Sequence, residues 1–209
     1  MPQIVNFGLF VTASILLIVT PGPDMMYVIA RGVGQGRWAG LLSALGVCTG
    51  LLFHVFAAAL GLSALLRTSL VAYSIVKYVG AAYLVYLGIR TLLDRGEQAK
   101  AETRPALGSG RIFLQGVLSN VLNPKVALFF LAFLPQFVPS TGDSTFLPML
   151  VLGFTFTGMG IVWLTGLACL SGSVGQWLTT NRRVRRAMQA ISGIALVGLG
   201  VRIALARRS

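Results

Sequence analysis

The stretch IVTPGPD at residues 18–24 interrupts an apolar run that extends from Ile4 to Ala30. The run is long enough to cross the hydrocarbon core of a membrane, which takes about 20 helical residues. Pro21 and Pro23 cannot continue a regular helix, because each lacks an N–H and its ring clashes with the carbonyl four residues earlier. The sequence therefore predicts a membrane helix that is broken near its centre.

Length and composition place the whole chain in a membrane. Of its 209 residues, 56% are hydrophobic and only 11% are charged, and the mean hydropathy is +0.82. These values lie outside those of a soluble domain. No segment shows the alternating polarity of barrel strands, so we expect an all-α membrane protein with six transmembrane helices. The predicted spans are Ile4–Ala30, Trp38–Leu65, Leu70–Leu93, Ile112–Val138, Phe146–Gly172 and Val184–Ala206.

The formal net charge is +12, which in a soluble protein would suggest nucleic acid. Here the basic residues gather at the ends of the predicted spans, so we expect contacts with the lipid bilayer and no nucleic-acid partner. The densest cluster, at residues 182–186, is interpreted as a cytoplasmic anchor. The glycine-rich stretch 32–36 follows a membrane helix and no strand, so we expect a flexible connector and no phosphate loop.

Six spans would place both termini on one side of the membrane. The loops after the first, third and fifth spans carry 11 basic residues, Arg31 and Arg37 among them, against 5 on the other side. Because basic residues are retained in the cytoplasm, this asymmetry predicts that both termini lie outside.

An internal repeat divides the single transmembrane domain, residues 1–209. Residues 84–90 read LVYLGIR and residues 196–202 read LVGLGVR, an offset of 112. We expect two three-helix repeats, 1–93 and 112–209, joined by a polar linker at 94–111. An odd number of spans in each half would make the repeats inverted. Chance similarity between apolar helices is the alternative.

The second repeat has its own break, because Pro124 lies inside the fourth predicted span. Prolines in the two breaks would release the backbone carbonyls of the residues four positions earlier, which need a partner inside a membrane. Gly22 would add flexibility to the first break and let a ligand approach the backbone. The released carbonyls are those of Leu17, Val19 and Asn120.

A charged residue follows the proline in each break. Asp24 is the only acid within a predicted span, and Lys125 is the only basic residue near the middle of one. Each would cost about 2.5 to 3.5 kcal/mol or more at the bilayer centre if it faced lipid unpaired. Both side chains are therefore expected to face protein or water. One interpretation is a binding site, and the alternative is a structural pair in which the two charges neutralise each other.

As a binding site, the two breaks suit a zwitterion. The N-terminus of a half-helix after Pro23 or Pro124 favours a carboxylate, while released carbonyls and Asp24 favour an ammonium. Side-chain amides of Asn120 and Asn123 would add hydrogen bonds. This combination matches an α-amino acid.

The second predicted span carries His54, which we expect to be a packed or hydrogen-bonded interior histidine, with a proton carrier as the alternative. On the same span, Gly46, Thr49 and Gly50 form a small-residue face that favours helix packing over recognition.

Four motifs resemble those of the LysE/RhtB family of bacterial amino-acid exporters: TPGPD at 20–24, GAAYLVYLG at 80–88, NVLNPK at 120–125 and LPQF at 134–137. The resemblance implies an inner-membrane exporter of amino acids or their derivatives, and no enzyme. The termini that the basic residues place outside would then be periplasmic, and no cofactor is predicted. The Pro-Gly-Pro-Asp form is similar to the homoserine/threonine branch, which implies a small, neutral, polar substrate. The residues carried over are Pro21, Gly22, Pro23, Asp24, Asn123, Pro124 and Lys125.

For transport we expect alternating access, in which a proton on Asp24 weakens ammonium binding and drives antiport. Glycines on several spans permit a homodimer. Two other functions remain open. A membrane thiol oxidoreductase would need a close cysteine pair, whereas Cys48 and Cys169 lie on different predicted spans. A divalent-metal exporter would need several oxygen ligands, which the carboxylate-poor spans do not offer, and no metal site is predicted.

Overall fold

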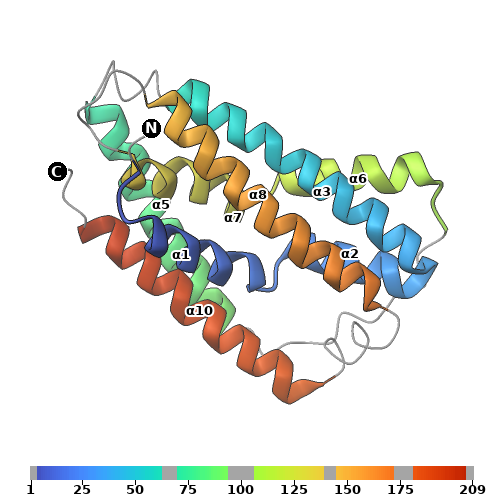
Figure 1. The fold of residues 1–209 in the computed structure, drawn as a ribbon. Coiled ribbons are helices and arrows are strands. Elements are labelled where there is room, and N and C mark those ends of the chain that lie inside the picture. Colours follow the sequence, from blue (N-terminus) through green and yellow to red (C-terminus); the bar gives the residue numbers. More distant parts are fainter. Residues whose placement is uncertain (1–3, 63–69, 94–105, 139–144, 172–180, 206–209) are drawn as a thin grey trace.

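The computed structural model describes residues 4–62, 70–93, 106–138, 145–171 and 181–205, and every regular element in these ranges is helical (Figure 1). The elements are α1 (Phe7–Val19), α2 (Pro23–Gln35), α3 (Arg37–Ala57), the π-helical turn η1 (Ala58–Leu62), α5 (Leu70–Leu93), α6 (Ser109–Val121), α7 (Pro124–Leu128), η2 (Phe129–Phe133), η3 (Leu134–Phe137), α8 (Phe146–Cys169) and α10 (Arg182–Leu205).

Both expected helix breaks are present. The axis bends by 49° between α1 and α2, and by 43° between α6 and the helical segment Pro124–Phe137. Each second half begins with its proline at the first helical position, where the missing N–H has no partner to lose. The predictions of a broken first and a broken fourth helix are therefore confirmed.

Three helical segments, Arg37–Gly61, Ser74–Leu93 and Phe146–Cys169, are long and apolar enough to cross a membrane, and the number rises to five if each bent pair is one span. The chain is thus a multi-pass helical membrane protein. The apolar part of α10, Gln189–Leu205, is shorter than the other candidates. Six spans in two inverted repeats therefore stay a prediction, and most of the linker, residues 94–105, lies outside the described residues.

The prediction of a flexible connector at 32–36 is wrong, because α2 continues through Gln35. Only Gly36 of this stretch lies outside a helix, with a left-handed φ of 89°. Gly32 serves close packing, since a Cβ there would overlap the side chain of Ser171. Arg31 is likewise no loop residue: it lies within α2 and is buried. The first predicted span therefore ends one turn too early.

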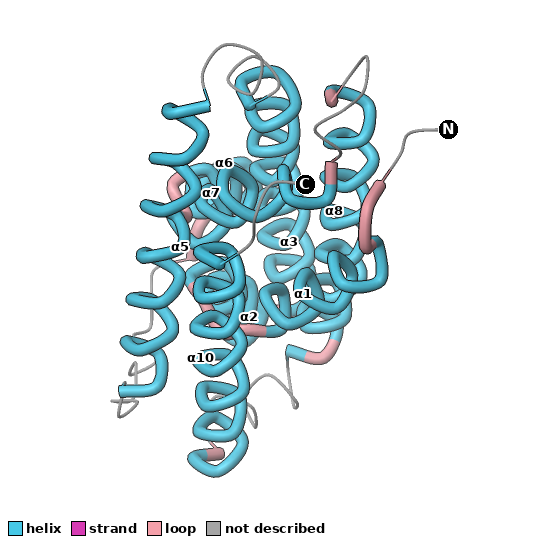
Figure 2. Tube along the Cα trace, turned by 90° about the vertical axis from the view of Figure 1, so that its left-hand side faces the viewer, coloured by secondary structure: helices cyan, strands magenta, loops and turns pink. Residues whose placement is uncertain are grey.

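α5 and α10 run side by side, as Figure 2 shows, through reciprocal glycine contacts. A Cβ on Gly88 would lie 2.7 Å from the carbonyl oxygen of Gly193 and 2.8 Å from the amide of Val197. One on Gly200 would lie 2.7 Å from the carbonyl oxygen of Ala81 and 3.0 Å from the amide of Val85. The two sets coincide when numbers are shifted by 112, the offset of the repeated motif.

Gly46 and Gly50 of the predicted small-residue face pack as expected, whereas the prediction is wrong for Thr49, which is exposed and donates to the carbonyl oxygen of Leu45 on its own helix. Gly46 approaches the backbone of Phe113 and Gly116 on α6, and Gly50 approaches that of Val117. A Cβ at either glycine would come within 3 Å of a carbonyl oxygen on α6. The glycines therefore let α3 and α6 pack backbone to backbone, as small residues do in membrane helices.

The two breaks divide the interior into ends of different character. On one side, α1 and the segment η2–η3 share an aromatic core in which neighbouring ring centroids lie 4.7 to 6.4 Å apart. On the other side α2 and α6 extend together away from the breaks (Figure 1). The buried rings of the aromatic core are Phe10, Phe129, Phe133 and Phe137.

Candidate functional site at the two helix breaks

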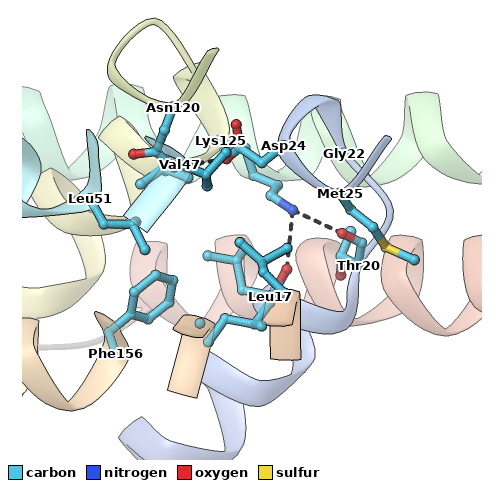
Figure 3. A pocket seen from close by; sticks show the side chains of 14 residues that line it. Leu17, Thr20, Gly22, Asp24, Met25, Val47, Leu51, Asn120, Lys125 and Phe156 are labelled. Carbon is cyan, nitrogen blue, oxygen red and sulfur yellow. Dashed lines mark hydrogen bonds between the residues drawn. The ribbon is translucent and has the colours of Figure 1, made fainter. Parts of the chain in front are cut away.

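A small cavity of about 40 Å³ lies where the two breaks meet, as Figure 3 shows. Residues of α3 and α8 contribute the rest of its lining. The lining is largely apolar, with a few polar and charged groups from the breaks. Its residues are Leu17, Ile18, Thr20, Gly22, Asp24, Met25, Val47, Leu51, Asn120, Lys125, Val126, Phe156, Gly160 and Leu164.

Asp24, in the first turn of α2, accepts three hydrogen bonds from α6 and the second break. Ser119 Oγ donates to Oδ1 at 3.0 Å, and the Nδ2 atoms of Asn120 and Asn123 each donate to Oδ2 at 2.8 Å. Neutral donors thus hold the carboxylate in place without cancelling its charge. Both predicted asparagines reach Asp24, and sequence analysis missed Ser119, although this serine lies one helical turn before Asn123.

Lys125, in the first turn of α7, makes the converse contact, because its side chain reaches from the second break to the first. Its Nζ donates to the carbonyl oxygens of Leu17 at 3.1 Å and of Thr20 at 3.0 Å (Figure 3). The Leu17 carbonyl is one that Pro21 was predicted to release. The ammonium therefore satisfies an acceptor that would otherwise stand unpaired inside the membrane.

Gly22 makes room for this ammonium. Its φ of −160° is an extended conformation open to any residue, so the backbone does not demand glycine. A Cβ at this position would instead lie 3.1 Å from Lys125 Nζ and 3.5 Å from Cε. The absence of a side chain at Gly22 is what allows the lysine to lie against the first break.

The two charged side chains line one cavity, but no ion pair joins Asp24 to Lys125, both of which are described residues. Each bonds neutral groups of the opposite break. The alternative of a simple neutralising pair is therefore wrong in its direct form. Each charge remains available to an additional polar group in the cavity.

One polar atom at the cavity has no partner among the described residues. Asn120 donates through Nδ2 to Asp24, while its Oδ1 is buried and accepts no hydrogen bond. A buried acceptor without a donor is uncommon and calls for a ligand or water. This oxygen lies toward α3, where a Cβ on Gly50 would be 3.2 Å from it.

His54 on α3 supports the second break from outside the cavity lining. Its Nε2 lies 3.0 Å from the carbonyl oxygen of Asn120, the carbonyl that Pro124 was predicted to release. The ring is buried against Phe53 and Phe130. The contacts are those of a packed, hydrogen-bonded histidine, and its proposed part in proton movement is not tested by them.

Asn123 has two roles at the second break. Its side-chain oxygen accepts a hydrogen bond from the backbone N–H of Lys125 at 3.0 Å and so caps α7, while its Nδ2 binds Asp24. The first turn of α2 has no side-chain cap, because Gly22 stands at the corresponding position. The N-terminus of α2 therefore keeps its partial positive charge facing the cavity side of the break.

Two other functions were considered, a membrane thiol oxidoreductase and a divalent-metal exporter. The cysteines that the first would need do not line the cavity. Cys48 is free and buried among apolar side chains of α2, α3 and α8, and Cys169 is free and exposed at the end of α8. Within the described ranges no group of three or more His, Cys, Asp and Glu side chains lies together. The acids other than Asp24 are outside those ranges: Asp94, Glu97, Glu102 and Asp143.

Comparison with known proteins gives a family match over most of the chain. The model of the LysE type translocator family matches residues 15–207. The membrane protein YrhP of Bacillus subtilis (strain 168) is 32% identical over 205 residues, which cover 94% of this chain and 97% of the relative. The leucine efflux protein of Salmonella typhimurium (strain LT2) is 29% identical over 205 residues, covering 96% and 95%. That of Enterobacter sp. (strain 638) is 29% identical over 202 residues, covering 96% of each. No solved structure matches the chain.

Proposed function

The chain belongs to the LysE type translocator family, and from this premise we propose that it exports neutral amino acids across the bacterial inner membrane. The observation that supports the proposal most directly is the placement of Asp24 and Lys125 on one cavity without an ion pair between them. An α-amino acid carries one positive and one negative group, so it is matched by this pair.

The substrate ammonium would bind the Asp24 carboxylate, which lines the cavity. The substrate carboxylate would bind Lys125, whose ammonium has three donors and uses two of them on backbone carbonyls. The positive N-terminal end of α2 lies beside that ammonium and favours the same negative group. Both ends of the zwitterion would then meet opposite charge within the membrane.

The lining favours an aliphatic substrate side chain. Apart from the groups just named, the cavity is walled mainly by leucine, isoleucine, valine, methionine and phenylalanine. The one hydroxyl in the lining, Thr20 Oγ1, already donates to the carbonyl oxygen of Leu16 at 2.6 Å. Several relatives are named leucine efflux proteins. We therefore propose leucine-like substrates ahead of the homoserine and threonine that the sequence motif suggested.

Transport would proceed by alternating access. The cavity lies where the two predicted repeats meet, so movement of one repeat against the other would change access to it. The reciprocal contacts of Gly88 and Gly200 support two related halves that could rock against each other. The start of α1 and the end of α10 lie toward the same end of the molecule, which supports an even number of crossings (Figure 1).

Proton coupling would act through Asp24. Protonation removes the negative charge that holds the substrate ammonium, so a proton entering from the acidic exterior would favour release there. Return of the proton to the cytoplasm would restore the carboxylate for the next substrate. The direction is antiport, with one proton moving in as an amino acid moves out.

The test is extracellular accumulation of leucine and of threonine by cells fed leucine- or threonine-containing dipeptides. The wild-type protein is expected to raise external leucine several-fold over empty vector, while Asp24→Asn returns it to the vector level at equal membrane abundance. Asp94→Asn, the same change in a predicted loop, is the matched control and should export normally. No rise in any neutral amino acid with wild type would overturn the proposal, whereas a rise in threonine alone would overturn only the substrate preference.

A further inference from the structure

A line of polar side chains connects the cavity with the far end of α2. Asp24, Tyr27, Arg31 and Gln35 follow one another at intervals of three or four residues, so they share one face of the helix. Asp24, Tyr27 and Arg31 are each hydrogen-bonded to a residue of α6, and Gln35 is hydrogen-bonded to Leu107, which lies just before α6. We call these four residues and their hydrogen-bond partners the polar seam.

The bonds of the polar seam join the first predicted repeat to the second and, at Leu107, to the end of the predicted linker. Tyr27 Oη donates to the carbonyl oxygen of Ile112 at 2.7 Å, and Arg31 Nη2 donates to Gln115 Oε1 at 3.1 Å. Farther along, Gln35 Nε2 donates to the carbonyl oxygen of Leu107 at 3.2 Å. Between Tyr27 and Gln35, α2 therefore donates hydrogen bonds to neutral acceptors, whereas Asp24 accepts three hydrogen bonds at the cavity end.

Arg31 is the charged centre of the seam, and it lacks an anionic partner there. Its side chain is only 6% exposed. Its second bond runs from Nη1 to Gln35 Oε1 at 2.7 Å, and its guanidinium carbon lies 5.6 Å from the centre of the Tyr27 ring. A guanidinium has five N–H donors and is always charged, and a buried one is ordinarily paired with a carboxylate or phosphate. The two partners that bond Arg31 in the described part of the chain are both amides.

We propose that Arg31 is a carboxylate-binding residue, which receives the amino-acid carboxylate between the end of α2 and the cavity and in doing so releases Gln115. This inference rests on the proposed export of amino acids. A carboxylate accepts two parallel bonds from a guanidinium, which a glutamine amide oxygen cannot match, so exchange of Gln115 for substrate is favourable. Because Gln115 lies on α6, the exchange separates α2 from α6 and opens the seam toward the cavity.

Arg31 and the cavity bind the substrate one after the other. Seven residues separate Arg31 from Asp24, a rise of about 10.5 Å along the helix. In the proposed order, the substrate carboxylate first binds Arg31 and then passes to Lys125 at the cavity.

Among the residues that the structure describes, no comparable row of polar side chains leads to the opposite end of the interior. There the space between α1 and η3 is filled by buried phenylalanine rings, for example Phe10 and Phe137 at 5.3 Å between centroids. The Arg31 end is also the end that the distribution of basic residues predicts to be cytoplasmic, the side from which an exporter takes substrate.

The experiment uses the purified full chain in proteoliposomes, with leucine counterflow and leucinamide, which lacks the carboxylate, as a competitor. Arg31→Gln, which keeps hydrogen-bonding capacity and loses charge, should raise the KM for leucine at least fivefold with kcat within twofold. The inhibition constant of leucinamide should stay within twofold. Arg31→Lys, which keeps the charge, should recover part of the loss in KM.

A second variant guards against a folding defect at Arg31. Gln115→Glu places a permanent carboxylate 3.1 Å from the guanidinium, so it should lower leucine counterflow at least tenfold while thermal stability in detergent is kept. Gln136→Glu, on η3 and outside the seam, is the matched control.

The inference is overturned if Arg31→Gln and Gln115→Glu both transport leucine within twofold of wild type. It is overturned equally if both variants lose stability and respond alike to leucine and leucinamide, since Arg31 would then be structural. If wild type gives no leucine counterflow while leucine export also fails in the dipeptide experiment, the fault lies in the proposed function. If wild type exports leucine normally and the Arg31 and Gln115 variants transport it equally well, only the role of Arg31 in carboxylate binding is refuted.

Discussion

The ammonium of Lys125 lies 3.1 Å from the carbonyl oxygen of Leu17, the acceptor that Pro21 frees from its helix. The lysine belongs to the second break and the carbonyl to the first. Asp24 makes the converse connection, from the first break to Asn120 and Asn123 of the second. Each interruption thus receives its hydrogen bonds from the other, so movement at one break must alter the other.

Lys125→Met tests this connection. Removing the ammonium leaves the carbonyls of Leu17 and Thr20 without their donor, and an unsatisfied buried carbonyl costs about 1 to 3 kcal/mol. We expect a lower melting temperature in detergent and loss of most leucine export. Lys77→Met on α5, at a half-buried lysine that does not line the cavity, is the matched control. Normal export by Lys125→Met would contradict a role for Lys125 in binding.

Gly22→Ala should reduce export without preventing folding. The new Cβ would lie 3.1 Å from Lys125 Nζ, and a flexible lysine can retreat by the few tenths of an ångström required, at the expense of its bonds to Leu17 and Thr20. We expect a several-fold loss in leucine counterflow at near-normal protein level. A Cβ on Gly34 of α2 would have no atom outside its own stretch of helix within 4 Å. Gly34→Ala should therefore transport normally and gain about 0.5 to 1 kcal/mol of helix stability. Equal behaviour of the two variants would argue against the close approach.

His54 can be tested by a pair of substitutions. His54→Gln retains an N–H donor for the Asn120 carbonyl but no titrating group, whereas His54→Leu retains neither. If His54 only supports the break, His54→Gln should keep export and its dependence on external pH, while His54→Leu should lose stability. Loss of pH dependence in a stable, active His54→Gln protein would assign proton transfer to this residue.

The reciprocal glycines predict matched effects. Gly88→Ala and Gly200→Ala each place a Cβ 2.7 Å from a carbonyl oxygen of the facing helix, so both should lower the melting temperature by similar amounts. Gly198→Ala on α10 meets no atom within 4 Å and should be neutral or mildly stabilising. A large effect at only one of Gly88 and Gly200 would contradict the two-fold relation of α5 and α10.

Local chemistry was sufficient for several predictions. The prolines located both helix breaks because the missing N–H and the ring clash act within four residues of the proline. The length of an apolar run is also a local property, and it predicted the long helices. For one of them, Leu70–Leu93, the structure has the predicted bounds. The motifs around Pro23 and Pro124 also identified the family, whose model covers residues 15–207.

The sequence alone determined that this is a helical membrane protein with a charge beside each proline break, because hydropathy and proline geometry are local properties. Only the tertiary structure decided that Asp24 and Lys125 bond opposite breaks and not each other, and that Arg31 is buried against Gln115. Such partners are 84 to 108 positions apart in the chain. Which donor reaches which carbonyl therefore depends on helix packing, and one of the glycines that permit close packing, Gly32, lies in a stretch that looks in sequence like a flexible connector.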